Sequence, residues 1–295
     1  SVDLMRGPTG SEVLLTIGRR GTQDPFDVTV IRDIIKVPSV RSRELMKGYL
    51  WLRAAQFQKD TGNEAIAVLQ EALAESDLKG VVLDLRNNPG GVLGASVDMA
   101  GALLDGGLVV YTEGRHPQAA ERFEASSGDI LDDLPIVVLI NGGSASASEI
   151  VAGALQDRRR AVIMGTRSFG KGSVQTILPV TETRAVKLTT ALYYTPNGRS
   201  IQAEGIVPDI VVERAEVKSV ESARRTKESD LQGSLSGGDP VDTEAESESL
   251  TELRNSDNQL YEALTLLRGI NLLRPTPVPE FSVDQTTVSA APASQ

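Results

Sequence analysis

Three serines and a lysine are the side chains of this 295-residue chain best suited to nucleophilic chemistry. Ser144, Ser146 and Ser148 alternate with alanine after Asn141-Gly-Gly143, and Glu149 follows them. The small side chains let a substrate backbone approach, and a helix beginning here would direct its N-terminal amides at a developing negative charge. A serine and a glutamate three residues apart also form a capping box, so the residue types alone do not choose among the three serines.

Lys171 lies in a second glycine-rich stretch, Gly165-Thr-Arg-Ser-Phe-Gly-Lys-Gly172. The spacing is close to that of a phosphate-binding loop, but such a loop needs Ser or Thr after the lysine and a helix beyond it. Here Gly172 follows the lysine, and residues 173–179 have strand composition. We therefore reject nucleotide binding. A lysine that is kept from water can instead lose its proton and act as a general base for a serine.

The composition narrows the chemistry further. The chain has no Cys and a single His, His116, so thiolate and His-rich metal sites are excluded, and we expect no cofactor and no metal. A Ser-His-Asp triad could use only His116, which we expect in an exposed loop. The net charge of -10 argues against a nucleic-acid partner. The longest apolar runs, such as Leu134–Ile140, are too short for a membrane span.

The elements that must position these groups follow from the hydrophobic pattern. Apolar runs typical of buried strands alternate with helical stretches, which favours an α/β layered core. The expected strands are Val81–Leu85, Leu108–Tyr111, Pro135–Ile140, Ala161–Met164, Val174–Leu178 and Val186–Tyr194, and the expected helices begin near Thr61, Ala95, Ser144 and Asn255.

The composition also divides the chain into segments. Residues 1–35 carry a helix remnant and two strands, which bury too little to fold alone, so we expect the chain to begin inside a module. Residues 36–214 carry the α/β core. Residues 215–254 are charged and rich in Ser and Gly, which predicts a disordered linker. A helix is expected at 255–269 and a low-complexity, disordered tail at 270–295.

Four motifs together resemble the carboxyl-terminal processing proteases, also called tail-specific proteases, which are serine peptidases with a Ser-Lys dyad. The motifs are Arg86-Asn-Asn-Pro-Gly-Gly91, Asn141-Gly-Gly-Ser-Ala-Ser-Ala-Ser-Glu-Ile150, Phe169-Gly-Lys-Gly-Ser-Val-Gln175 and Tyr194-Thr-Pro-Asn-Gly-Arg-Ser200. The resemblance covers residues 1–213 and the helix at 257–269. It implies a layered crotonase/Clp-like protease core and a PDZ domain, of which residues 1–35 would be the C-terminal part.

The resemblance also assigns site residues. It places the nucleophile at Ser146, the general base at Lys171 and a residue that orients the lysine at Gln175. It implies an oxyanion hole made of two backbone amides, one from Ala147 and one from Gly91, with Gly90 as a close rival of Gly91. No imidazole and no cofactor is needed in such a mechanism.

The implied function is that of a serine endopeptidase that hydrolyses protein substrates recognised near their C-termini. The alternative is a catalytically inactive peptide-binding scaffold. The resemblance further implies a bacterial periplasmic or envelope-associated location, a homo-oligomer with the C-terminal helix at a contact, and a helical-repeat lipoprotein adaptor that delivers substrates. For that helix the alternative is packing on its own core.

Overall fold

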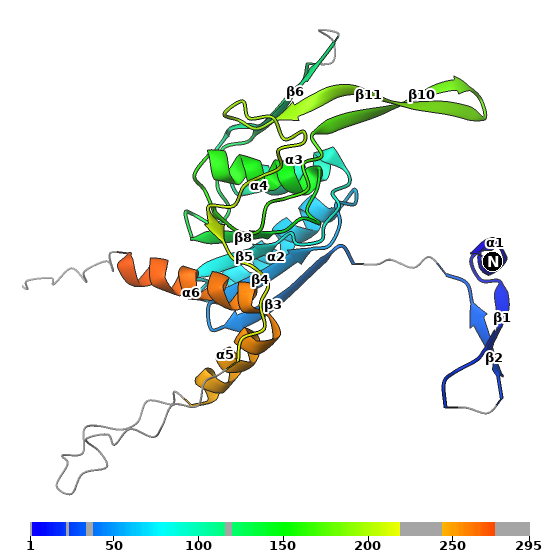
Figure 1. The fold of residues 1–295 in the computed structure, drawn as a ribbon, viewed down its shortest axis with the longest axis horizontal. Coiled ribbons are helices and arrows are strands. Elements are labelled where there is room, and N and C mark those ends of the chain that lie inside the picture. The colour runs from blue at the N-terminus through cyan, green and yellow to red at the C-terminus, as the bar shows by residue number, and fades with distance from the viewer. Residues whose placement is uncertain (1, 22–23, 34–37, 116–119, 219–243, 275–295) are drawn as a thin grey trace, which may run out of the picture. The chain divides into compact units, whose positions relative to one another are not determined.

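The computed structural model describes residues 2–21, 24–33, 38–115, 120–218 and 244–274 (Figure 1). They form two compact units, Ser1–Ser39 and Val40–Gln295, so the first unit extends slightly beyond the expected boundary at residue 35. His116, the centre of the expected linker and the expected tail beyond residue 274 lie outside the described residues.

The first unit consists of a short helix and a hairpin. Helix α1 (Val2–Met5) precedes the two expected strands, β1 (Glu12–Ile17) and β2 (Phe26–Ile31), which pair in antiparallel fashion. The Arg32 side chain joins these elements, because its Nε donates to the Met5 carbonyl at 2.9 Å and its Nη1 donates to the first carbonyl of β1 at 2.9 Å. A two-stranded hairpin with one helical turn has little core of its own.

A six-stranded sheet forms the centre of the second unit, in the order β12-β9-β8-β5-β4-β3. All neighbours are parallel except β3 and β4. The central strands β5 and β8 are buried at every residue, which is the pattern of a parallel sheet covered on both faces. The strands are β3 (Val40–Met46), β4 (Tyr49–Ala54), β5 (Gly80–Asp84), β8 (Ile136–Ile140), β9 (Val162–Gly165) and β12 (Ile210–Val211).

Helices cover both faces of this sheet. Helices α2 (Thr61–Glu75), α3 (Leu93–Ala102) and α4 (Ala147–Asp157) share the larger apolar core with one set of strand side chains. Helix α6 (Asn258–Leu273) shares a second core with the alternate set, among them Val82, Val137 and Leu139. The residues of α6 buried there are Leu260, Ala263, Leu264 and Leu267. The expected helix at 255–269 therefore packs on its own sheet, and this apolar face is not available to a second copy of the chain.

The predicted disordered linker at 215–254 is wrong over its last part. Helix α5 (Glu244–Ser256) covers residues 244–254 and leads directly into α6 (Figure 1). Its charged and polar composition gave no apolar pattern long enough to predict a helix. Among the described residues, the helices are too short or too polar for any of them to cross a bilayer.

A four-stranded antiparallel sheet adjoins the helical layer, in the order β10-β11-β6-β7. Its strands β10 and β11 form a long hairpin that projects from the second unit (Figure 1). The expected strand after Lys171 is confirmed, since β10 lies where a phosphate-binding loop would have a helix. The parallel sheet, its helices and this sheet confirm the α/β class. The strands are β6 (Gly107–Gly114), β7 (Arg122–Ala125), β10 (Ser173–Thr181) and β11 (Arg184–Tyr194).

Candidate active site

Ser146 occupies a strained turn between a strand and a helix. It is the N-cap residue of α4, and its backbone has φ 55° and ψ -113°. A side chain with a Cβ rarely adopts this conformation, which costs about 1–3 kcal/mol and is concentrated at functional sites. Its neighbours Ala145 and Ala147 are buried, whereas Ser146 itself is half-buried. The turn therefore leaves this serine accessible between two packed residues.

The other two serines of the motif have structural bonds. Both are fully buried. The Ser144 hydroxyl donates to the Leu85 carbonyl at 2.8 Å, and the Ser148 hydroxyl donates to the Asn88 carbonyl at 2.9 Å. Such hydroxyls are committed to satisfying buried carbonyls and have no access to a substrate. This difference favours Ser146 as the nucleophile, a choice that the residue types left open.

Glu149 connects the serine turn to the lysine loop. Its side chain is fully buried, and its Oε2 accepts from the backbone N–H of Ser146 at 2.7 Å and from that of Lys171 at 2.9 Å. Its Oε1 accepts from the Gly170 N–H and from the Ser168 hydroxyl, both at 2.6 Å. One carboxylate thus holds the two segments side by side. The sequence indicated only the bond from Ser146, through capping-box spacing, and gave no sign of the other three.

Lys171 is half-buried, and Gln175, the residue expected to orient it, is not among its described hydrogen-bond partners. Gln175 is exposed on β10, at an irregularity in the pairing with β11 between Val174 and Gln175. Among the described contacts, no hydrogen bond joins Gln175 to Lys171 or the side chain of Lys171 to Ser146. Besides Glu149, the Gln202 side chain also binds this loop, and its Oε1 accepts from the Gly172 N–H at 3.1 Å.

Two backbone amides, one next to Ser146 in the chain and one in the glycine loop, are candidate oxyanion donors. Within the described part of the chain, the N–H groups of Gly91 and Ala147 have no acceptor. The N–H of Gly90, in contrast, donates to Asn88 Oδ1 at 2.9 Å. This difference favours Gly91 over Gly90 as the partner of Ala147, because a donor that is already bonded is not free to bind an oxyanion.

We expect Gly90→Ala to lower kcat/KM about 100-fold or more, because the added Cβ would displace the Ala147 amide and losing one oxyanion donor costs that much. A Cβ at Gly90 would lie 2.6 Å from the Ala145 carbonyl, 2.8 Å from Ser146 Cβ and 2.9 Å from the Ala147 nitrogen. Gly128→Ala is the matched control, because its φ of 107° resembles the 93° of Gly90 but its Cβ would meet nothing within 4 Å. Kinetics and thermal unfolding of both variants test this, and an equal loss of activity in both would contradict it.

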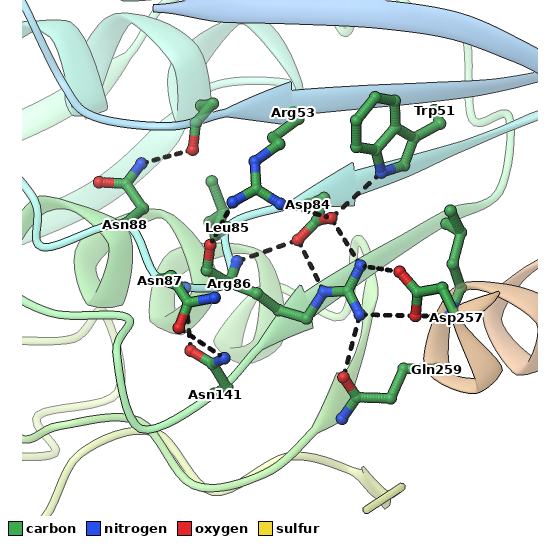
Figure 2. Close-up of polar contacts among 12 residues, drawn as sticks. Trp51, Arg53, Asp84, Leu85, Arg86, Asn87, Asn88, Asn141, Asp257 and Gln259 are labelled. Atoms are coloured by element: carbon green, nitrogen blue, oxygen red, sulfur yellow. Dashed lines mark hydrogen bonds and ion pairs between the residues drawn. The ribbon is translucent and has the colours of Figure 1, made fainter. Parts of the chain in front are cut away.

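A buried charge network lies at the start of the loop that carries Gly91 (Figure 2). Arg86 lies between two carboxylates, with its Nη2 2.7 Å from Asp84 Oδ2 and 2.7 Å from Asp257 Oδ2. Burial alone would lower the pKa of Arg86, but hydrogen bonds to both carboxylates and their charges raise it. For Asp257, burial acts to raise the pKa, and the bonds and charge of Arg86 outweigh it and lower the pKa. Both groups are therefore held in their charged forms.

The profile of a known family, peptidase family S41, matches residues 48–212. This span includes the serine turn, the glutamate and the lysine loop. The chain belongs to peptidase family S41. The serine turn and the lysine loop described above therefore lie in the part of the chain that matches the family.

Individual relatives agree with this assignment. A carboxy-terminal-processing protease of Bartonella bacilliformis is 50% identical to this S41 chain over 275 residues, which are 91% of the chain and 63% of the relative. A carboxyl-terminal-processing protease of Synechocystis is 39% identical over 214 residues, 71% of the chain and 49% of the relative. The S41 chain thus spans only about half to two thirds of the length of these relatives.

A solved structure also shares the fold of the S41 chain. The photosystem II D1 C-terminal processing protease superposes with a TM-score of 0.54 at 31% sequence identity. The similarity covers 70% of this chain and 57% of that protein.

Proposed function

We propose that this chain is a serine endopeptidase of the carboxyl-terminal processing type, with Ser146 as the nucleophile and Lys171 as the general base. The observation that carries the proposal is the shared carboxylate of Glu149, which binds the backbones of both residues. Membership of peptidase family S41 supports it. The bonds of Ser144 and Ser148 to buried carbonyls support the choice of Ser146.

In this mechanism the neutral amine of Lys171 accepts the hydroxyl proton as Ser146 attacks a substrate carbonyl. The free N–H groups of Gly91 and Ala147 bind the oxyanion that forms. The lysine ammonium then protonates the departing amine, which leaves an acyl group on Ser146. Water hydrolyses this ester with Lys171 again as the base. For Gln175 the proposed role is to orient the amine once substrate is bound, when active-site contacts often tighten.

The type of core, the PDZ module, the cellular location and the partners are part of the same proposal. The core would be of the crotonase/Clp-like type, and residues 1–35 would be the C-terminal part of a PDZ module, a type of domain that captures substrate C-termini. The α1 turn and the β1–β2 hairpin are compatible with such a module. A periplasmic or envelope location, a homo-oligomer and a helical-repeat lipoprotein adaptor rest on the family resemblance alone.

The function is tested by incubating the purified chain with a loosely folded protein substrate across a pH series. We expect internal cleavage, detected by mass spectrometry of the fragments, and a rate that rises toward alkaline pH because an amine base must be neutral. A peptide-binding scaffold would give a different result, namely saturable peptide binding without cleavage at any pH. Cleavage that does not rise with pH would argue against a lysine base.

A further inference from the structure

We propose that Asp257, at the N-terminus of helix α6, is a positioning residue for the loop of residues 86–91 that carries the proposed oxyanion donor. The proposal rests on the proposed function for its kinetic part. It makes the C-terminal helix, distant in sequence from the dyad, a support of the active site.

The contact between Asp257 and Arg86 is part of a network that uses every N–H group of the Arg86 guanidinium (Figure 2). Arg86 Nη1 and Nη2 donate to the two oxygens of Asp257 at 2.8 and 2.7 Å, so the pair is bidentate. Arg86 Nε and Nη2 form a second fork on Asp84, at 2.9 and 2.7 Å. A further bond joins Nη1 to Gln259 Oε1 at 3.0 Å. All five guanidinium N–H groups are therefore used, which fixes both the position and the plane of the Arg86 side chain.

The loop then connects Arg86 to the serine turn. The Arg86 backbone N–H donates to Asp84 Oδ1 at 3.0 Å, so the network holds the main chain as well as the side chain. Two residues later, the Asn88 carbonyl accepts from the Ala145 N–H at 3.0 Å and from the Ser148 hydroxyl at 2.9 Å. These two residues flank Ser146. A shift of Arg86 would therefore move the loop relative to the nucleophile.

The helix that carries Asp257 is anchored independently of this contact. Its apolar residues lie in the second core of the sheet. In addition, Asn258 Nδ2 donates to the Glu213 carbonyl at 2.8 Å, and Gln259 Nε2 donates to the Val212 carbonyl at 2.6 Å. Loss of the Asp257 charge would thus leave α6 in place. It would also leave Arg86 paired with Asp84, a carboxylate that Arg86 shares with Arg53.

Asp257→Asn separates the two roles of this residue. Asp257 Oδ1 also caps α6, accepting from the Leu260 N–H at 3.1 Å, and asparagine is an equally good cap. It cannot, however, form a fork of two charged bonds with Arg86. We expect kcat to fall about 10- to 100-fold, as for small misplacements of catalytic groups, with KM changed less than about twofold. Asp257→Glu, which restores the charge, should recover part of kcat.

A control for stability is Leu264→Ala, which truncates a fully buried apolar side chain of α6. Leu264 belongs to the second core of the sheet and is not part of the charge network. This substitution should lower the unfolding temperature while kcat of the folded protein stays near that of the unaltered chain. The proposal is overturned if Asp257→Asn keeps full kcat. It is also overturned if Leu264→Ala and Asp257→Asn lose kcat equally, since a general loss of stability would then explain both.

A second measurement does not depend on proteolysis. Amide hydrogen exchange is followed in peptides that span residues 85–92, with Ser146→Ala in every variant to prevent self-cleavage. We expect faster exchange of this segment in Asp257→Asn than in the matched Asp257 chain, and unchanged exchange in β8. Unaltered exchange in the 85–92 segment would overturn the proposal that Asp257 positions this loop. If the unaltered chain cleaves no substrate, the proposed function fails, but this exchange result still decides the role of Asp257.

Discussion

Ser146→Ala and Lys171→Ala should each lower kcat/KM by about 10⁴-fold or more, since a nucleophile and its base act as one unit. The double variant should be no worse than either single one. The measurement is cleavage of a loosely folded protein by chains of equal purity. Thermal unfolding should show that both variants remain folded. The Lys171 side chain makes no described hydrogen bond, and the Ser146 hydroxyl makes only the capping-box bond with the Glu149 N–H, whose loss costs about 0.5–2 kcal/mol.

Lys47→Ala is the matched control for the lysine. Lys47 is exposed in the turn between β3 and β4, so its loss should leave kcat/KM unchanged. Equal activity in the unaltered chain, Ser146→Ala and Lys171→Ala would rule out the dyad. Additive losses in the double variant would show instead that the two residues act independently.

The second large effect is expected for Glu149→Gln. The carboxylate accepts four hydrogen bonds in a fully buried position, and an amide has only one acceptor oxygen. The NH2 group of the glutamine would face N–H or O–H donors, with which it cannot form a hydrogen bond as an acceptor. Each buried donor left without a partner costs about 1–3 kcal/mol. The serine turn and the lysine loop would then separate, and we expect kcat/KM to fall about 100-fold or more.

Glu64→Gln is the matched control for this substitution. Glu64 lies in the first turn of α2 as Glu149 lies in that of α4, but its side chain is exposed. Kinetics and denaturant unfolding of both variants provide the comparison. A Glu149→Gln protein with normal kcat/KM and lowered stability would show that the carboxylate stabilises the fold without aligning the dyad.

Much of the fold could be predicted because its central strands are continuous apolar runs. Val81–Leu85 and Pro135–Ile140 indicated β5 and β8 to within a residue. Strand β3 was not predicted, since its charged side chains are exposed at the edge of the sheet and leave no apolar alternation. Whether α6 packs on its own core or at an oligomer contact was left open, because the helix pattern gives an apolar face without its partner.

The sequence predicted which residues form the candidate site but only some of the contacts between them. Family motifs pointed to Ser146, Lys171 and the glycine loop, and the structure adds the reason why Ser144 and Ser148 are poor rivals. Contacts between distant segments have no local pattern in a sequence. The bonds of Glu149 to the lysine loop and of Arg86 to Asp257 are of this kind.

The order of residues along the chain determines when the Arg86–Asp257 contact can form during synthesis. A ribosome adds Asp257 well after Ser146 and Lys171, and domains fold as their segments emerge. With Asp257 as a support of the glycine loop, a growing chain carries its serine and lysine before that loop is fully held. Full catalytic activity would then be reached only after helix α6 has left the ribosome and Asp257 has bound Arg86.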